Sequence, residues 1–304
     1  FNQDIGGWNV STVTDMSMMF QAASSFNQDI SGWDVSGVTD MGDMFYDALA
    51  FNQDISGWTV TSVTDMSGMF CGATVFNQPI GSWNVANVTD MGSMFQNTDA
   101  FNQDISGWDV GSVTDMAHMF YHAKSFNQNI NSWDVSAVTT MANMFNGADS
   151  FNQDLNNWNT ANVTSMSLMF VGADVFNGDI STWDVSNVTS MPSMFNSAFA
   201  FNQDISNWNT SSCTNMDNMF YNAHAFDQDV GGWDISNVIS IDFGFYNAIY
   251  STKNYDALLN GWASQPVQPN LTFKAIKVKY SSAGAAARQT LIDTYGWTIN
   301  DAGQ

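Results

Sequence analysis

FNQDISGWDVSGVTDMGDMFYDALA, residues 26–50, is one copy of a 25-residue unit that recurs from Phe1 to Tyr250. Ten copies follow one another, and each begins with Phe and carries Trp at its eighth position. A unit of this size cannot bury its own apolar side chains, so neighbouring copies must stack and share one core. The repeat therefore predicts an elongated array and favours function on an extended surface. Positions 1–25 below are counted from the Phe of each copy.

The second half of the unit predicts a short helix. Positions 16, 19, 20 and 23 are apolar in most copies, as in Met41, Met44, Phe45 and Ala48. This spacing places apolar side chains on one face of a helix. The Thr and Asp at positions 14 and 15 supply an N-cap hydroxyl and an acid for the positive end of the helix. We therefore expect each unit to end in two or three helical turns.

The first half of the unit predicts a short strand. Trp33 and Val35 alternate as in a strand, and Ile30 and Val38 lie on either side of them. This spacing resembles the LxxLxLxxN core of leucine-rich repeats, with Val38 where that motif often has Asn. The resemblance implies an α/β solenoid, a right-handed array of ten units, with a parallel sheet of short strands on one face and short helices on the other.

The recurring apolar and amide side chains predict columns of stacked residues along the array. Phe at positions 1 and 20, Trp at position 8 and Met at position 16 recur in register, which favours internal columns rather than an exposed aromatic stripe. Asn occupies position 2 in nine copies, from Asn2 to Asn202. A column of identical amides is typical of a ladder in which each side chain bonds the next turn of the array.

Charge narrows the classes of partner. All 29 acidic residues are Asp, and the formal net charge is −23. Residues 1–250 hold 26 of these Asp residues and one basic residue, Lys124. A field of this sign disfavours nucleic acid and anionic lipid, which proteins bind with Lys and Arg. No apolar run reaches the ~18 residues of a membrane span, so we expect no membrane insertion.

A polar, acidic ribbon is the predicted binding surface. If Trp and Val of each strand point inward, positions 7, 9 and 11 point outward. These positions carry small polar or acidic residues and no Arg, Tyr or Trp anchor, so we expect a partner that is polar, basic or bridged by ions. A solvated face without a partner is the alternative. The predicted binding residues are Asn9, Asp34, Thr59, Asn84, Asp109, Asp134, Asn159, Asp184, Asn209 and Asp234.

A second acidic column lies at position 4 and raises the question of calcium. Like charges about 5 Å apart repel by roughly 1 kcal/mol in water, so the column either splays into solvent or is bridged by a hard cation such as Ca²⁺. The D-x-D-x-D-G pattern of a Ca²⁺ loop is absent. We expect no cofactor, with Ca²⁺ as the alternative. The column comprises Asp4, Asp29, Asp54, Asp104, Asp154, Asp179, Asp204 and Asp229, and Pro79 and Asn129 interrupt it.

No catalytic pattern emerges from the sequence. His118 and His122 stand four residues apart, but no third ligand accompanies them, so we expect an exposed pair. Cys71 and Cys213 lie in copies six units apart, about 30 Å at the ~4.8 Å spacing of stacked strands, which excludes a disulfide. Catalysis requires one asymmetric constellation, and we expect a protein that is not an enzyme. A deep pocket between array and cap would argue otherwise.

The repeat stops after Tyr250, and residues 251–304 form a predicted capping unit. Residues 254–263 carry a helical apolar stripe, and residues 271–280 alternate as a half-exposed strand does. Ser281-Ser282 can cap a helix over residues 283–295, and residues 297–299 predict a last strand. We expect this unit to cover the apolar end of the last copy, as array proteins require.

The repeats, followed by YDALLNGWA and ARQTLIDTYGWTI, resemble the BspA-type leucine-rich-repeat surface proteins. The resemblance implies an extracellular or cell-surface protein, a non-enzymatic adhesion module that presents its acidic face to a protein or glycan on a cell surface or matrix. Two alternatives stay open: a structural spacer or filament subunit that self-associates through the uncapped N-terminal repeat, and a Ca²⁺-stabilised scaffold. The chain begins inside the repeat without Met, so we expect a fragment whose export signal lies outside it.

Overall fold

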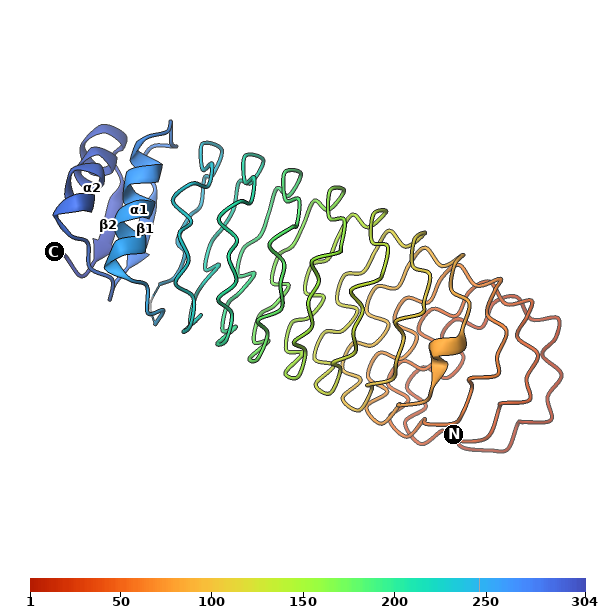
Figure 1. Ribbon diagram of the computed structural model, residues 1–304. Helices are drawn as coiled ribbons and strands as arrows, with labels where there is room; N and C mark the ends of the chain where they lie inside the picture. Colours follow the sequence, from red (N-terminus) through yellow and green to blue (C-terminus); the bar gives the residue numbers. More distant parts are fainter. Residues whose placement is uncertain (246) are drawn as a thin grey trace.

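The computed structural model describes residues 1–245 and 247–304. It is an elongated stack of coils, each one circuit of the backbone, with a compact C-terminal unit at one end and the N-terminus toward the other (Figure 1). Among these residues the regular elements are few: η1 (Ile80–Ser82), α1 (Thr252–Ala263), β1 (Thr272–Ala275), α2 (Ser282–Tyr295) and β2 (Thr298–Asp301). None of the helices described is both long and apolar enough to cross a bilayer. The chain is therefore built of repeated units with little helix or strand.

The helix predicted at positions 16–23 is wrong, because this segment is a run of tight turns. Met44 N–H donates to the Met41 carbonyl at 3.2 Å, and Ala48 N–H donates to the Phe45 carbonyl at 3.0 Å. Each of these turns has a left-handed third residue, with φ of 55° at Asp43 and 54° at Asp47. A left-handed residue every four positions breaks an α-helix. Outside the first copy, the apolar side chains at positions 16, 19, 20 and 23 are still buried, so their spacing fits both structures.

Backbone groups that a helix would satisfy internally are satisfied by the next coil instead. Asp43 N–H donates to the Ser67 carbonyl at 2.8 Å, and Asp47 N–H donates to the Cys71 carbonyl at 2.7 Å. Position 15 of each copy forms a parallel bridge with position 15 of the next, from Asp15 with Asp40 to Asn215 with Ser240. We call the side chains at positions 17, 18, 21 and 22, which are mostly half-buried and lie along this ladder, the ladder face.

The strand predicted at positions 8–10 is also wrong, since this segment lies between two turns. Trp33 N–H donates to the Ile30 carbonyl at 3.1 Å, and Val38 N–H donates to the Val35 carbonyl at 2.9 Å. These two turns lie on either side of the Trp-Val pair and leave no room for a regular strand between them. The predicted parallel pairing exists, but it lies on the opposite half of the unit, at position 15.

Internal aromatic columns are confirmed. Phe45 stacks on Phe51 with 3.9 Å between ring centroids and on Phe70 with 5.6 Å. Trp58 and Trp83 lie parallel at 6.5 Å. The indole N–H of each internal Trp, from Trp33 to Trp233, donates to the position 5 carbonyl of the preceding coil. The Trp column therefore contributes both apolar burial and a hydrogen-bonded ladder to the stack.

The predicted amide ladder at position 2 is confirmed as well. Asn52 Oδ1 accepts a hydrogen bond from the Asn77 backbone N–H at 2.9 Å and another from Gln78 Nε2 at 2.9 Å. Gln78 Nε2 also donates to the Asn52 carbonyl at 2.9 Å. The pattern recurs along the array, so Asn at position 2 and Gln at position 3 act as one pair that joins each coil to the next.

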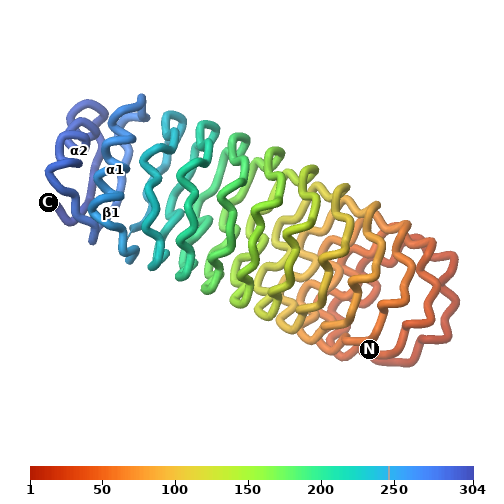
Figure 2. The backbone as a smooth tube through the Cα atoms, in the orientation of Figure 1, coloured from red at the N-terminus to blue at the C-terminus, as the bar shows by residue number. Residues whose placement is uncertain are grey.

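The capping unit has the elements that its sequence predicts. Ser281 caps α2 by accepting a hydrogen bond from Ala283 N–H, and β1 pairs in parallel with β2. The cap closes the end of the core: Phe243 lies 5.3 Å from Trp262 and 6.0 Å from Phe273 between ring centroids. Figure 2 shows the cap directly against the last coil of the stack.

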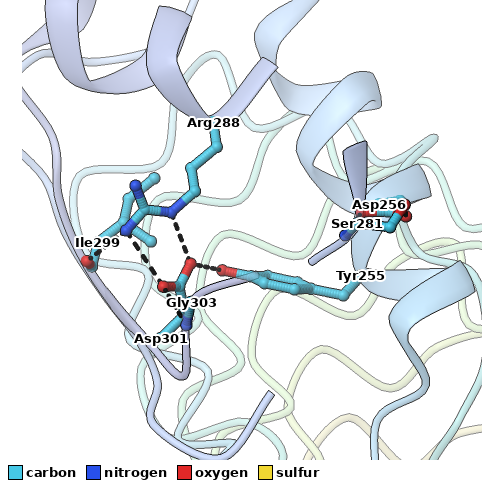
Figure 3. Close-up of polar contacts among 7 residues, drawn as sticks. All are labelled: Tyr255, Asp256, Ser281, Arg288, Ile299, Asp301 and Gly303. Carbon is cyan, nitrogen blue, oxygen red and sulfur yellow. Dashed lines mark hydrogen bonds and ion pairs between the residues drawn. The ribbon is translucent and has the colours of Figure 1, made fainter. Parts of the chain in front are cut away.

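A buried ion pair fastens the cap together (Figure 3). Arg288 of α2 donates from Nε to Asp301 Oδ2 at 2.7 Å and from a terminal nitrogen to Asp301 Oδ1 at 3.1 Å. The Tyr255 hydroxyl of α1 donates to Asp301 Oδ2 at 2.9 Å. Burial, followed by the negative charge of Asp301, raises the pKa of Tyr255. One carboxylate thus joins both helices to the last strand.

The opposite end of the stack has no such cover within the described residues. Phe1, Trp8 and Met18 are 64%, 56% and 55% exposed, whereas the other Trp side chains of the array are at most 4% exposed. The difference arises because each coil normally covers the apolar face of the coil that follows it. The first coil therefore presents an apolar surface.

Candidate functional site

The predicted column at position 9 lies on the surface. All ten of its side chains, from Asn9 to Asp234, are exposed. Successive members come from successive coils, so they form a line along the length of the stack. The structure therefore brings the predicted binding residues together on one face.

Their recurrence has a local structural cause. Asp34 Oδ1 accepts hydrogen bonds from the Ser36 backbone N–H at 3.2 Å and from the Ser36 hydroxyl at 2.6 Å. Equivalent bonds to the residue two positions on occur in every copy except the one with Thr59. Hydrogen bonds from the Ser36 side chain and backbone lower the pKa of Asp34 from its ordinary value of 3.8. Asn and Asp both make this turn, which explains why they interchange in the column.

The position 4 carboxylates also accept hydrogen bonds from the backbone of the residue two positions on. Asp29 Oδ1 accepts from Ser31 N–H at 2.9 Å, and Asp204 Oδ1 accepts from Ser206 N–H at 3.0 Å. Asp154 departs from this rule, because its Oδ1 accepts from Asp179 N–H of the next coil at 2.9 Å. In the described part of the chain, no group of three or more His, Cys and Asp side chains is arranged to hold a metal ion. The turns account for the recurrence of Asp at position 4.

Between the columns, the surface is hollowed. We use the name polar face for the side chains at positions 3, 4, 6, 7 and 9, of which positions 4, 7 and 9 are mostly exposed and positions 3 and 6 mostly half-buried. One groove on it has a volume of about 440 Å³, and a smaller one of about 350 Å³ lies nearer the N-terminus. The larger groove is lined by Asp104, Ser106, Gln128, Asn129, Asn131, Ser132 and Asn157. The smaller groove is lined by Asp29, Ser31, Gln53, Asp54, Ser56 and Gly57.

A second surface, the ladder face, could not be predicted from the sequence, because the apolar spacing assigns these residues to a helix. His118 and His122 are half-buried rather than exposed, which corrects the prediction, and both have left-handed φ angles. Tyr121 lies between them, 4.4 Å from the His122 ring and 5.8 Å from the His118 ring. Burial lowers the pKa of His118. The available signal was the frequency of Gly, Asn, Asp and Ser at positions 18 and 22, which favours left-handed turns.

A third hollow, of about 390 Å³, lies where the array meets the cap. Lys274 Nζ pairs with Asp242 Oδ2 at 2.7 Å on its wall, and the Ser240 hydroxyl donates to the Asp217 carboxylate. The Lys–Asp pair links β1 to the last coil. This pair fastens the cap to the array, whereas the Ser240–Asp217 hydrogen bond joins the last two coils of the array.

The two cysteines are buried and are not joined to each other, as predicted. Burial raises the pKa of the Cys71 thiol to about 12 and that of the Cys213 thiol to about 11. Thiols with such values stay protonated at neutral pH and are poor nucleophiles. Both side chains act as small apolar residues of the core.

Comparison with known proteins identifies the family of this array. The family model described as "Mycoplasma protein of unknown function, DUF285" matches residues 1–77, 56–158 and 150–262, which together span the array and reach α1. Neither the curated proteins nor the solved structures that were searched contain a match. Because the matched stretches cover more than half of the sequence, the chain belongs to the DUF285 family of repeat proteins.

Proposed function

We propose that residues 1–250 form a right-handed solenoid of ten units of the leucine-rich-repeat type, related to the BspA-type surface proteins, and that residues 251–304 cap it. The spacing of the parallel bridges supports this proposal. Nine bridges join positions that are 25 residues apart, from Asp15 to Ser240. Each bridge advances the chain by one coil, as in an array with nearest-neighbour contacts.

We also propose that the chain is a non-enzymatic extracellular interaction module whose polar face binds a protein or glycan on a cell surface or matrix. The observation that carries the proposal is the exposed position 9 column, in which all ten side chains lie in line. In nine of the ten copies a hydrogen bond to the backbone fixes the side chain. Fixed side chains lose little conformational entropy on binding.

The charge of the array defines the chemistry of the partner. Its Asp residues outnumber its basic residues by 26 to one, so a basic or neutral polar partner meets no repulsion, whereas nucleic acid and anionic lipid do. The polar face has no aromatic anchor. Binding through many weak polar contacts along the column therefore fits this face better than a single hot spot.

Isosteric charge removal tests the proposal. The triple variant Asp109→Asn, Asp134→Asn and Asp184→Asn keeps the turn-forming oxygen, as Asn84 and Asn209 do in the native chain. We expect binding of the labelled protein to cell surfaces or matrix to weaken by about tenfold or more, since each lost charge contributes modestly.

The matched control neutralises Asp40, Asp65 and Asp115 at position 15, on the other half of the unit. It changes the net charge equally and should leave binding within about twofold of wild type, because the residues lie off the polar face. If both variants lost binding equally, the loss would be explained by net charge alone and not by the polar face. Failure of the native chain to bind any cell surface, matrix protein or glycan would overturn the proposal.

We propose, as the alternative function, a structural spacer or filament subunit that self-associates end to end. Each coil is joined to the next by the same parallel bridge, from Asp15 with Asp40 to Asn215 with Ser240, and a coil of a second chain can continue such a stack. Light scattering over a range of protein concentrations tests it, with Trp8→Asp as the variant. A wild-type chain that stays monomeric at high concentration removes this function.

A further inference from the structure

The larger groove of the polar face differs from the rest of the array in the residues that line it. Position 4 is Asp104 on one wall, but the next coil has Asn129 in place of Asp. Position 6 is Asn131 where most copies have Ser or Gly. From these departures we infer that the groove is a binding site for a neutral polyhydroxyl ligand, the chemistry of a glycan. The inference rests on the proposed function and names the ligand class of that surface.

Three groups keep hydrogen-bonding capacity that the protein does not use. Gln128 Nε2 donates to the Asn102 carbonyl at 3.0 Å and to Asn102 Oδ1 at 2.9 Å, which holds the side chain and leaves Oε1 as an acceptor. Asn129 Oδ1 accepts from Asn131 N–H at 3.0 Å, which leaves Nδ2 as a donor. Asp104 Oδ1 accepts from Ser106 N–H at 2.9 Å, and a carboxylate has about four acceptor sites in all.

A chain of amide hydrogen bonds holds the far wall of the groove. Asn157 N–H donates to Asn131 Oδ1 at 2.9 Å, and Asn131 Nδ2 donates to Asn156 Oδ1 at 2.9 Å. Asn156 Nδ2 continues the chain to Asp179 Oδ2 at 3.1 Å. Such bonds between position 6 side chains of successive coils occur only here in the described part of the array. They fix the wall before a ligand arrives, which reduces the entropy lost on binding.

The pattern of free groups matches adjacent hydroxyls. The residues that line this groove of about 440 Å³ include one with an unused donor, Asn129, and two with unused acceptors, Gln128 and Asp104, and a hydroxyl both donates and accepts. A sugar ring with adjacent hydroxyls can therefore satisfy Asn129 Nδ2 together with Gln128 Oε1 or Asp104. An anionic ligand is disfavoured by Asp104, and the volume lies within the range of small-ligand sites.

The smaller groove is a natural comparison. It also has Gln at position 3. Both of its position 4 residues are Asp, namely Asp29 and Asp54, and it has Gly57 at the position of Ser132 in the larger groove. Two carboxylates offer acceptors only and repel each other. We therefore expect the neutral ligand to prefer the larger groove.

Binding of maltotriose, cellotriose, lactose and N-acetyllactosamine, measured by saturation-transfer NMR and titration calorimetry, tests the inference. Asn129→Asp keeps the turn with Asn131 N–H but removes the donor, and we expect it to weaken binding about tenfold or more. Asp54→Asn in the smaller groove serves as the matched control and should not weaken binding.

Three results would overturn the inference: no binding of any of these saccharides, equal binding by wild type and Asn129→Asp, or an equal loss with Asp54→Asn. Cell-surface binding measured in parallel separates the two levels of the proposal. If Asn129→Asp loses the saccharides but binds cells as the native chain does, the groove stands as the saccharide site and the cell-surface partner binds elsewhere on the polar face. If the native chain binds the saccharides but no cell surface, the groove stands without that function.

Discussion

Replacing Gly172 with Ala distinguishes the observed turns from the helix that the apolar spacing predicts. In the interior of a helix, Ala is more favourable than Gly by roughly 0.5–1 kcal/mol. Gly172 has a φ of 61°, and there a Cβ costs about 1–2 kcal/mol. The two backbones therefore give the same substitution opposite signs.

The expected loss follows from the surroundings of Gly172. A Cβ added there meets nothing within 4 Å, so only the backbone cost applies. Ala also lowers the entropy of the unfolded chain, which offsets about 0.4–1 kcal/mol, and the net loss is about 1 kcal/mol. At Gly147, with φ of 67°, the added Cβ would lie 2.2 Å from His122 Nδ1. Steric displacement adds to the backbone cost there, for a total of roughly 2–3 kcal/mol.

Thermal and urea unfolding followed by Trp fluorescence measures these differences, and 1 kcal/mol corresponds to a fall in Tm of about 2–4 °C. Gly107→Ala is the control, because its Cβ also meets nothing within 4 Å and its φ is not left-handed. We expect the control to match or exceed wild type. A Gly172→Ala variant more stable than wild type would refute the turn assignment.

Three further substitutions test the parts of the fold separately. Burial, followed by repulsion from neighbouring carboxylates, raises the pKa of Asp90 above its ordinary value of 3.8, so ionisation of this carboxyl destabilises the fold. Asp90→Asn should therefore raise Tm at pH 7. The gain should vanish below pH 3.8, where the carboxyl is protonated in the folded and the unfolded chain. Asn52→Ala removes Oδ1, the acceptor of two hydrogen bonds of the amide ladder, and should lower the free energy of unfolding by about 2 kcal/mol, whereas Asn52→Asp should lie near wild type. Arg288→Met leaves the carboxylate of Asp301, 2% exposed, without its partner and should cost about 3–5 kcal/mol, measured by calorimetry; losses below 1 kcal/mol would contradict the role of the pair.

Sequence reasoning succeeded where one contact repeats along the stack. The position 2 amides could be predicted because the same residue recurs in nine of the ten copies and therefore lies next to its equivalent in the neighbouring coil, and Asn52 accepts from the coil of Asn77 as expected. The cap could be predicted because its helices are long and carry capping residues, such as Ser281 before α2. In both cases local chemistry and tertiary structure favour the same arrangement.

Sequence reasoning failed where two backbones bury the same side chains. Met41, Met44 and Phe45 lie inward in the observed turns, as they would in a helix. The deciding residues are Asp43 and Asp47, whose left-handed φ angles turn their N–H groups toward the next coil. A pattern of apolar positions carries no information about where the backbone hydrogen bonds go.

The candidate site shows the same division. The position 9 column was predicted to be exposed, and it is exposed. Its role in turns could not be predicted, because the assumed strand has no turn for Asp34 to close. The groove around Asn129 was also beyond prediction, since its walls come from residues more than 20 positions apart in the chain.

The amino-acid sequence alone predicts a repeated array and the side chains that fill its core. It also predicts a strongly acidic surface and a distinct unit that closes one end of the array. These properties follow from composition and from the register of the repeat. Three properties became apparent only from the fold: the coils are joined through position 15, the Asp and Asn columns close turns, and the amides near Asn129 line a groove. These properties depend on hydrogen bonds between coils, and the partner of each group becomes defined only when one coil lies on the next.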